Sequence, residues 1–285
     1  VWREVYRVLK PGAHLLCFAG TRTQDLMTIS LRLAGFEIRD VIEWLYFSGF
    51  PKSMDVSKAF DRRAGAEREV IGVRKSEGGR SGVSNSVGGH LINYGKEIEI
   101  TAPATPLAKK WDGWGTALKP AHEPIILARK PLDGTVADNV ERWGAGALNI
   151  DGCRIPISAE DLAEIRKKAN KDKDKWVETR DPKGRLQFMT SKEIPQFGNE
   201  KGRFPANCVT TEPDAFYSKY FNVTPPELSK KASKKDRLLT WDGRQVKANR
   251  HPTVKPTDLM AWLVRLITPP GGTVLDPFAG SGSTL

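Results

Sequence analysis

The chain has 285 residues, 39% of them hydrophobic, and its 45 lysines and arginines exceed its 34 acidic residues for a formal net charge of +11. This content supports a folded core and excludes a wholly disordered or fibrous protein, and the lack of a long apolar run or a signal-peptide leader leads us to expect a cytoplasmic protein without a membrane partner. The positive charge fits a polyanionic partner, and the alternative is a basic surface that binds nothing.

The first fifty residues alternate helices with strands. Apolar residues at helical spacing predict a helix over residues 2–9, and a short apolar run predicts a buried strand over 14–19. Residues 36–47 are rich in β-branched and aromatic side chains, which predicts extended chain. Because strands alternate with helices, we predict an α/β fold with a largely parallel sheet. A second helix comes between the strands, and its predicted inner face consists of Leu26, Ile29 and Leu33.

The middle of the chain is less regular. Ser53 is predicted to cap a helix that runs to about Ala64. Residues 65–119 are rich in glycine, serine and basic residues and predict a long loop, after which an apolar run over 123–130 predicts a strand that returns to the sheet. A charged helix is predicted near residues 158–168.

The last part of the chain predicts a ligand site. A helix opens at Pro256-Thr257, and residues 273–275 predict a strand that ends in Asp276 and leads into Gly-Ser-Gly. An open α/β sheet binds small ligands at such a strand end. A nucleotide phosphate loop is excluded because Ser283, and not a lysine, follows Gly282. The predicted helix carries four apolar residues on one face, namely Leu259, Leu263, Leu266 and Ile267.

The cysteines and histidines give no sign of a metal site or a disulfide framework. No second His, Cys or acid lies at ligand spacing from His122 or His251, so we expect structural hydrogen bonding from both and no metal. The cysteines are odd in number and far apart, and we expect reduced, unreactive thiols at Cys17, Cys153 and Cys208.

The sequence HPTVKP at residues 251–256, followed after about twenty residues by DPFAGSGSTL at 276–285, resembles the DNA methyltransferases that act on adenine N6 or cytosine N4. The order is the circularly permuted one, in which the cofactor-binding half follows the catalytic half. Further stretches that resemble this family are WREVYRVLKPGAHLLCF, EWLYFSGFPKSMDVSKAFD, AHEPIILARKP, GALNIDGCRIP and GRFPANCV. The resemblance implies a Rossmann-like, S-adenosylmethionine-dependent sheet, circularly permuted, with a large inserted DNA-recognition region.

The resemblance also implies a division of the chain. Residues 1–50 would hold strands and helices of the catalytic half, 51–120 an inserted basic region, and 121–130 a core strand. Residues 131–250 would form the target-recognition insertion, and 251–285 the cofactor-binding segment. The family carries an Asp/Asn/Ser-Pro-Pro-aromatic tetrapeptide just before the WREVYRVLKPG helix, and this chain does not contain it. We therefore expect a fragment, truncated at both ends, that is inactive alone and has no catalytic residue of its own.

S-adenosylmethionine carries a sulfonium cation, an amino acid end and an adenosine, so its site needs an acid, open backbone and an apolar wall. By resemblance, Asp276 holds the methionine end and Phe278 packs on the ligand. The alternatives are that Asp276 is a helix N-cap and that Phe278 is a core residue. The implied cofactor-binding residues are Thr253, Lys255, Pro256, Asp276, Pro277, Phe278, Gly280, Ser281 and Gly282.

The target base must leave the duplex, and flipped bases are held by aromatic or apolar side chains. The candidates for this base pocket are Gly20, Trp44, Tyr46 and Phe50, and an aromatic in an apolar strand is otherwise a core residue. The expected partner is double-stranded DNA, and the role of methylation stays open between a bacterial restriction-modification system, a phage and a regulatory function. The alternatives are a non-catalytic DNA-binding module and an RNA methyltransferase of the same fold. Candidate DNA-binding residues are Lys109, Lys110, Lys230, Lys231, Lys234 and Lys235.

Overall fold

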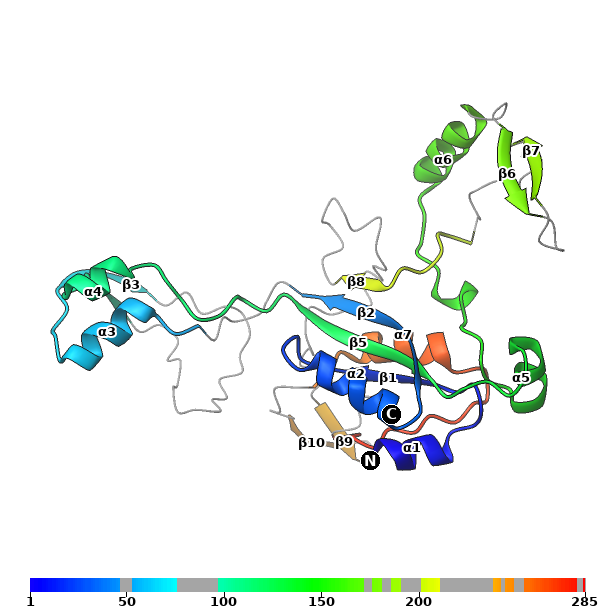
Figure 1. The fold of residues 1–285 in the computed structure, drawn as a ribbon, viewed down its shortest axis with the longest axis horizontal. Coiled ribbons are helices and arrows are strands. Elements are labelled where there is room, and N and C mark those ends of the chain that lie inside the picture. The colour runs from blue at the N-terminus through cyan, green and yellow to red at the C-terminus, as the bar shows by residue number, and fades with distance from the viewer. Residues whose placement is uncertain are drawn as a thin grey trace. The chain divides into compact units, whose positions relative to one another are not determined.

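The computed structural model describes residues 1–46, 53–75, 97–171, 176–180, 186–190, 201–210, 238–241, 244–248, 254–280 and 284. Figure 1 shows the ribbon with its helices and strands labelled. The chain divides into two compact units. Unit 1 comprises Val1–Tyr46, His122–Lys230 and Pro256–Leu285, and unit 2 comprises Phe47–Ala121 and Lys231–Lys255. Within the described residues, no helix has the length and apolar character that crossing a membrane requires.

Unit 1 is built on a four-stranded sheet with the order β1-β5-β2-β8. These strands are β1 (His14–Phe18), β2 (Glu37–Leu45), β5 (His122–Arg129) and β8 (Cys208–Thr210). The predicted strand positions are confirmed for β1, β2 and β5, but the predicted largely parallel sheet is wrong. Strand β5 is antiparallel to both β1 and β2, and only β8 runs parallel to β2. The chain reaches β5 after a long excursion and not through a βαβ crossover, so it enters between β1 and β2 in the opposite direction.

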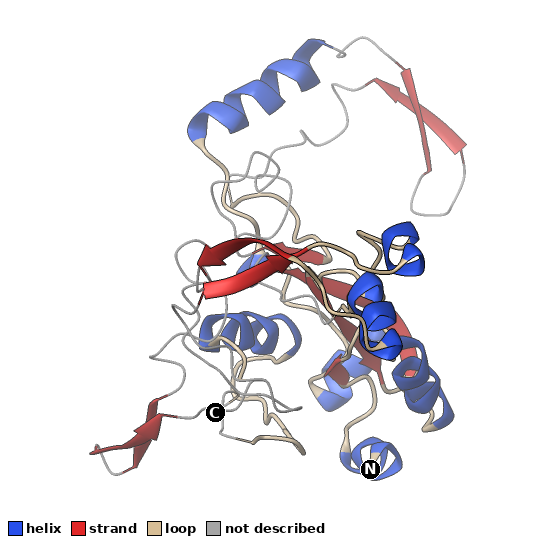
Figure 2. Cartoon of the chain, turned by 90° about the vertical axis from the view of Figure 1, so that its left-hand side faces the viewer, coloured by secondary structure: helices blue, strands red, loops and turns tan. Residues whose placement is uncertain are grey.

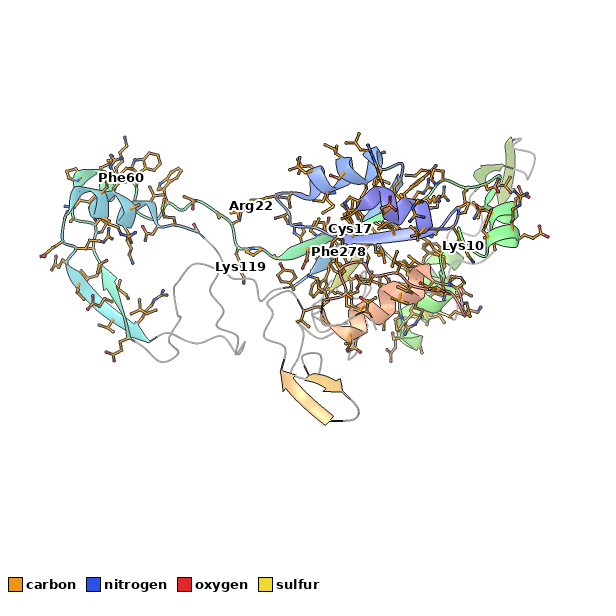
Figure 3. The ribbon with its side chains drawn as sticks, turned by 90° about the horizontal axis from the view of Figure 1, so that it is seen from below. Lys10, Cys17, Arg22, Phe60, Lys119 and Phe278 are labelled. Atoms are coloured by element: carbon orange, nitrogen blue, oxygen red, sulfur yellow. The ribbon has the colours of Figure 1, made fainter. Side chains whose placement is uncertain are left out.

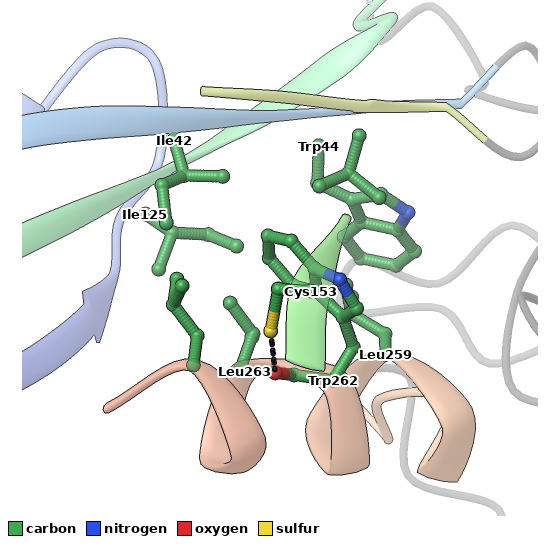
Figure 4. Packing of buried hydrophobic residues seen from close by; sticks show 9 residues of the cluster. Ile42, Trp44, Ile125, Cys153, Leu259, Trp262 and Leu263 are labelled. Atoms are coloured by element: carbon green, nitrogen blue, oxygen red, sulfur yellow. Dashed lines mark hydrogen bonds between the residues drawn. The ribbon is translucent and has the colours of Figure 1, made fainter. Parts of the chain in front are cut away.

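Helices cover both faces of this sheet (Figure 2). On one face, α7 (Thr257–Ile267) packs against Ile42, Trp44 and Ile125 (Figure 4). On the other, α1 (Trp2–Val8) and α2 (Gln24–Leu33) pack against the next residue of β5, Ile126. Neighbouring residues of a strand point to opposite faces, which is why Ile125 and Ile126 belong to different clusters.

The inner face of α7 agrees with the sequence, whereas that of α2 does not. Leu259, Leu263 and Leu266 of α7 are buried, as predicted. The predicted inner face of α2 is wrong, because Leu31 is fully buried and the residues packed beside it are Met27 and Ala34. The three residues predicted to face inward are all exposed, namely Leu26, Ile29 and Leu33.

The predicted strand over residues 273–275 is also wrong. This segment has no strand pairing to any described residue, and Val274 and Leu275 are exposed. A strand exists only through hydrogen bonds to a neighbour, and the described strands of unit 1 pair with one another instead.

A buried asparagine fastens the start of unit 1 to α5 (Val136–Trp143). Asn139 Nδ2 donates to the carbonyl oxygens of Pro11 at 3.1 Å and Ala145 at 2.7 Å, and its Oδ1 accepts from the backbone N–H of Asp133 at 2.8 Å. Gly12 has φ +73°, and a Cβ there would lie 2.3 Å from Asn139 Nδ2. The turn between α1 and β1 therefore requires glycine beside this asparagine.

The rest of unit 1 lies in the region predicted as an insertion. It contains the 3₁₀ helix η1 (Asp151–Cys153), α6 (Ala159–Lys171), and the antiparallel pair β6 (Trp176–Arg180) and β7 (Leu186–Thr190). The helix α6 confirms the charged helix predicted near residues 158–168.

Unit 2 contains more regular structure than the predicted loop. Its elements are α3 (Val56–Ala64), β3 (Val70–Lys75), β4 (Glu97–Thr101), α4 (Pro106–Lys110), β9 (Leu238–Trp241) and β10 (Arg244–Ala248). The loop prediction for 65–119 is wrong where β3, β4 and α4 form. The prediction of Ser53 as the cap of α3 is wrong as well. Asp55 caps the helix by accepting from Lys58 N at 3.0 Å, while Ser53 Oγ accepts from the backbone of Thr116.

A buried carboxylate holds α3 and α4 together. Asp61 Oδ1 accepts from the N–H and hydroxyl of Thr105, at 3.0 and 2.8 Å. Asp61 Oδ2 accepts from Ala104 N at 3.0 Å and from Arg68 Nη1 at 2.6 Å. Burial alone would raise the pKa of this carboxyl, but the hydrogen bonds from Ala104, Thr105 and Arg68 outweigh it and lower the pKa to about 2. The ionised carboxylate is therefore the form on which the contact between α3 and α4 depends.

Candidate active site at the carboxyl edge of the sheet

Three strands of unit 1 end at one edge of the sheet. Strands β1 and β2 are both antiparallel to β5, and β8 is parallel to β2, so β1, β2 and β8 share one direction. Ala19 N donates to Pro124 O at 3.0 Å, just beyond the end of β1. The next residue is the exposed Gly20, which therefore lies beside Glu123 of β5, and Glu123 pairs with Trp44 on the other side. Gly20 and Trp44 therefore flank β5 at the edge where open α/β sheets bind ligands.

The two described aromatic candidates at this edge differ in burial. Trp44 is 3% exposed and packs in the core beneath α7, as an aromatic core residue does. Tyr46 packs against it, with ring centroids 5.3 Å apart, and remains half-buried. Burial raises the pKa of the Tyr46 phenol, and the charge of Glu123 raises it further. Phe50 lies outside the described residues, and the base-pocket role of all four candidates stays a prediction.

Two polar pairs that the sequence did not single out join strands of the sheet. At this edge, His122 Nε2 lies 3.5 Å from Glu43 Oε2, an ion-pair contact without a hydrogen bond, so the structural hydrogen bonding expected of this histidine stays a prediction. Away from this edge, in the amino-terminal half of β2, Asn207 Nδ2 donates to Asp40 Oδ1 at 3.1 Å. No sequence pattern identifies these pairs, because strand pairing alone brings residues so distant in the chain together.

The segment after α7 places an acid, an exposed aromatic ring and a glycine close together. Asp276 Oδ1 accepts from the N–H of Phe278 at 2.9 Å, and its Oδ2 accepts from the Thr284 hydroxyl at 2.6 Å. Phe278 is 64% exposed (Figure 3), so the alternative that it is a core residue is wrong. The bond to Phe278 N places Asp276 in a local turn. No helix follows it in the described residues up to Gly280, so they do not support the alternative role of Asp276 as a helix N-cap. Gly280 has φ +55° and only one backbone atom near its Cβ position.

An aromatic contact joins this segment to the first helix. The rings of Trp2 and Phe278 meet edge to face, with centroids 5.7 Å apart and planes at 64°. Trp2 is the first residue of α1, and α1 precedes β1 in the chain. The contact therefore connects the Asp276 segment with the helix that leads into the first strand of the sheet.

The remaining cofactor candidates are placed only in part. Pro256 is fully buried at the N-cap of α7, the half-buried Lys255 precedes it, and Pro277 is exposed. Those outside the described residues are Thr253, Ser281 and Gly282. The described set includes a carboxylate, an exposed ring and a backbone that is open at glycine. A carboxylate fits the cationic part of S-adenosylmethionine, an exposed ring fits its apolar part, and a glycine lets the backbone come close to the ligand.

The DNA-binding candidates are likewise described only in part. Lys109 and Lys110 are exposed in the last turn of α4, where a cation also interacts favourably with the helix dipole. The others lie outside the described residues, namely Lys230, Lys231, Lys234 and Lys235.

The thiols of unit 1 lack the character of a nucleophile. Burial raises the pKa of Cys17 to about 11. Burial and the charge of Glu43 raise the pKa of Cys208 to about 11, and burial raises that of Cys153. Thiols with raised pKa values are protonated at neutral pH and unreactive. No group of three or more His, Cys, Asp or Glu that could hold a metal ion was found in the part of the chain that the structure describes.

Comparison with known proteins places the chain in a family. A family model for N6/N4 methyltransferases, described as DNA methylase, matches residues 1–285. The chain is 22% identical over 285 residues to the Type II methyltransferase M.HindIII of Haemophilus influenzae, an alignment that covers 99% of this chain and 57% of that protein. The chain thus spans little more than half the length of this relative. The resemblance inferred from the motifs is confirmed, and the chain belongs to the DNA methylase family.

Proposed function

We propose that this chain supplies the cofactor-binding segment and the sheet edge of an enzyme that methylates DNA. The reaction would transfer a methyl group from S-adenosylmethionine to the N6 amine of adenine or the N4 amine of cytosine in specific duplex sequences. The observation that carries this proposal is the match of the family model over the whole chain. The relative bears the name of a Type II methyltransferase, which favours a restriction-modification role over a non-catalytic DNA-binding module or an RNA methyltransferase.

The Asp276 segment would hold the cofactor. The Asp276 carboxylate would bind the cationic amino acid end, the exposed ring of Phe278 would pack on the ligand, and Gly280 would let the backbone approach it. The contact of Trp2 with Phe278 would orient the ring. When bound, the cofactor supplies a methyl group on a positively charged sulfur, which is open to attack by an amine.

The target amine would be received at the carboxyl edge of the sheet. Its lone pair is delocalised into the base, so hydrogen-bond acceptors must hold the N–H groups and direct the lone pair at the methyl group. The Asp/Asn/Ser-Pro-Pro-aromatic tetrapeptide does this in the family, and the 285 residues do not contain it. We therefore propose that methyl transfer requires that tetrapeptide, and that Gly20 and Tyr46 border the pocket into which the base flips.

The proposed fold is the permuted, Rossmann-like methyltransferase sheet with a target-recognition insertion within residues 131–250. One local contact supports the insertion. The backbones of Ile155 and Arg203 bond to each other in both directions, at 3.0 and 2.8 Å. The Asp151 carboxylate forms ion pairs beside this contact, with N–O distances of 2.8 Å to Arg154 and 2.6 Å to Lys201. The chain between them leaves and returns at one point, as an inserted segment does.

Calorimetry with S-adenosylmethionine tests the cofactor site. The unvaried chain should bind, and Asp276→Ala should weaken binding about tenfold or more, because a hydrogen-bonded charge is lost. Asp25→Ala in the first turn of α2 serves as the matched control and should bind as the unvaried chain does. Salt-dependent DNA binding without cofactor uptake would instead support the non-catalytic module.

A methylation assay tests the reaction. The chain in a protein that carries the tetrapeptide should transfer labelled methyl groups to duplex DNA, and the chain without it should not. Uptake of cofactor by the protein with the tetrapeptide, without methylation of duplexes of varied sequence, would refute the proposed function.

A further inference from the structure

Unit 2 displays a tryptophan to solvent directly after α4. Trp114 is 60% exposed, and its ring meets that of Trp111 edge to face, with centroids 5.0 Å apart and planes at 77°. Scattered exposed apolar residues are ordinary, but tryptophan is the largest side chain, and exposing it forgoes much of the free energy that its burial would release. Whether such an exposed ring serves to bind a ligand depends on how firmly the backbone holds it in place.

The turn that carries Trp114 is anchored by hydrogen bonds to the start of α3. Trp114 O accepts from Val56 N at 3.1 Å, and Ser53 Oγ accepts from Thr116 N at 2.9 Å. Gly115 forms a bridge with Asp55, and a Cβ at Gly115 would lie 2.4 Å from Ser53 Oγ. The indole is thus displayed on a backbone fixed to the start of α3, which lowers the conformational entropy lost when a ligand packs against it.

The surroundings of this ring are basic. Lys109 and Lys110 are exposed in the turn before Trp111, and neither has an ion-pair partner among the described residues. Residues 109–119 contain three lysines and one aspartate. The buried acid of this unit, Asp61, is neutralised by Arg68 at 2.6 Å and does not offset the lysines.

We propose that Lys109, Lys110, Trp111 and Trp114, here called the Lys-Trp face, form a DNA-binding surface in unit 2. The lysines would pair with phosphates, and the indole of Trp114 would pack against sugar and base. Ammonium groups beside an exposed aromatic ring match both parts of a nucleotide, whereas an acidic peptide would use only the charges. This inference rests on the proposed function, which makes DNA the substrate, and adds a contact that the cofactor and base sites do not provide.

The test is a titration of labelled duplex DNA by fluorescence anisotropy at several salt concentrations. Trp114→Ala should weaken binding about 5- to 50-fold at every salt concentration without changing the slope of log affinity against log salt, because the lost contact is uncharged. The double variant Lys109→Gln/Lys110→Gln should instead reduce the magnitude of that slope by about 0.9 for each lysine.

Two controls match these changes. Leu118→Ala removes a 93% exposed apolar side chain from the same segment and should leave DNA binding unchanged. The double variant Arg3→Gln/Lys10→Gln removes two exposed charges from unit 1 and measures the general effect of net charge. The Trp114→Ala protein should also bind S-adenosylmethionine as tightly as the unvaried protein does.

The outcomes separate this inference from the function on which it rests. If the unvaried protein binds duplex DNA and the Trp114→Ala protein binds equally well, the Lys-Trp face is refuted and the proposed function stands. If the unvaried protein binds no DNA, the proposed function fails and the inference fails with it. An equal loss of affinity for polyglutamate and for DNA on Trp114→Ala would also refute the DNA assignment.

Discussion

Removal of the buried amide of Asn139 should destabilise unit 1 severely. In Asn139→Ala, the carbonyl oxygens of Pro11 and Ala145 and the N–H of Asp133 lose their partner. The side chain is fully buried, so water does not replace it without opening the fold. At about 1–1.5 kcal/mol for each unsatisfied group, the free energy of unfolding should fall by about 3–5 kcal/mol. That is a large share of the total stability of about 5–15 kcal/mol typical of a domain.

Urea unfolding followed by far-UV circular dichroism measures this loss. Asn207→Ala is the matched control, because Asn207 is exposed and, among the residues that the structure describes, its side-chain amide bonds only to Asp40. This variant should change stability by no more than about 0.5 kcal/mol. A loss of less than about 1 kcal/mol in Asn139→Ala would refute the reasoning, since it would show that the three bonds are replaced or were not formed.

Three further predictions concern the contact between α3 and α4, the core and the thiols. The pKa of Asp61 falls from 3.8 to about 2 on folding, so the stability that its ionised carboxylate gives the fold is complete above pH 3.8 and is lost as pH falls toward 2. Acid unfolding followed by tryptophan fluorescence should show this loss. The variant Asp61→Asn should be less stable at neutral pH, and its stability should no longer depend on pH in this range. Leu263→Ala should destabilise unit 1 by about 2–5 kcal/mol in urea unfolding, because the side chain is 1% exposed beneath the sheet, and a loss as small as that of the exposed Leu118→Ala would contradict this packing. Cys17 and Cys208, with pKa values raised to about 11, should react slowly with a thiol reagent at pH 8 and quickly after denaturation, and fast labelling of the native protein would contradict their protonated state.

Helix α7 and helix α2 show what periodicity can and cannot predict. In α7 the apolar residues Leu259, Leu263 and Leu266 share a stripe, and this stripe is buried as predicted. Helix α2 carries two stripes with helical spacing, and the sheet covers the one that contains Leu31. Spacing restricts the choice to these stripes, and packing against the sheet selects one.

The direction of β5 and the burial of Trp44 also cannot be predicted from the local sequence pattern. The apolar run at residues 123–130 predicts a strand, but the direction of this strand depends on where the chain returns after the excursion through unit 2. Trp44 shares a face with Ile42 because alternate residues of a strand point the same way. Whether that face is pocket or core depends on α7, which follows more than two hundred residues later.

By itself, the sequence determined the family, through the spacing of HPTVKP and DPFAGSGSTL, and the positions of most α-helices and of β1, β2 and β5, because motif chemistry and apolar periodicity are local properties. The tertiary structure decided the antiparallel pairing of β5, the exposure of Phe278 and the burial of Trp44. It also decided the anchoring of the Trp114 turn by Ser53 and Val56. These features depend on contacts between residues far apart in the chain, and local pattern carries no information about which distant residue will lie opposite.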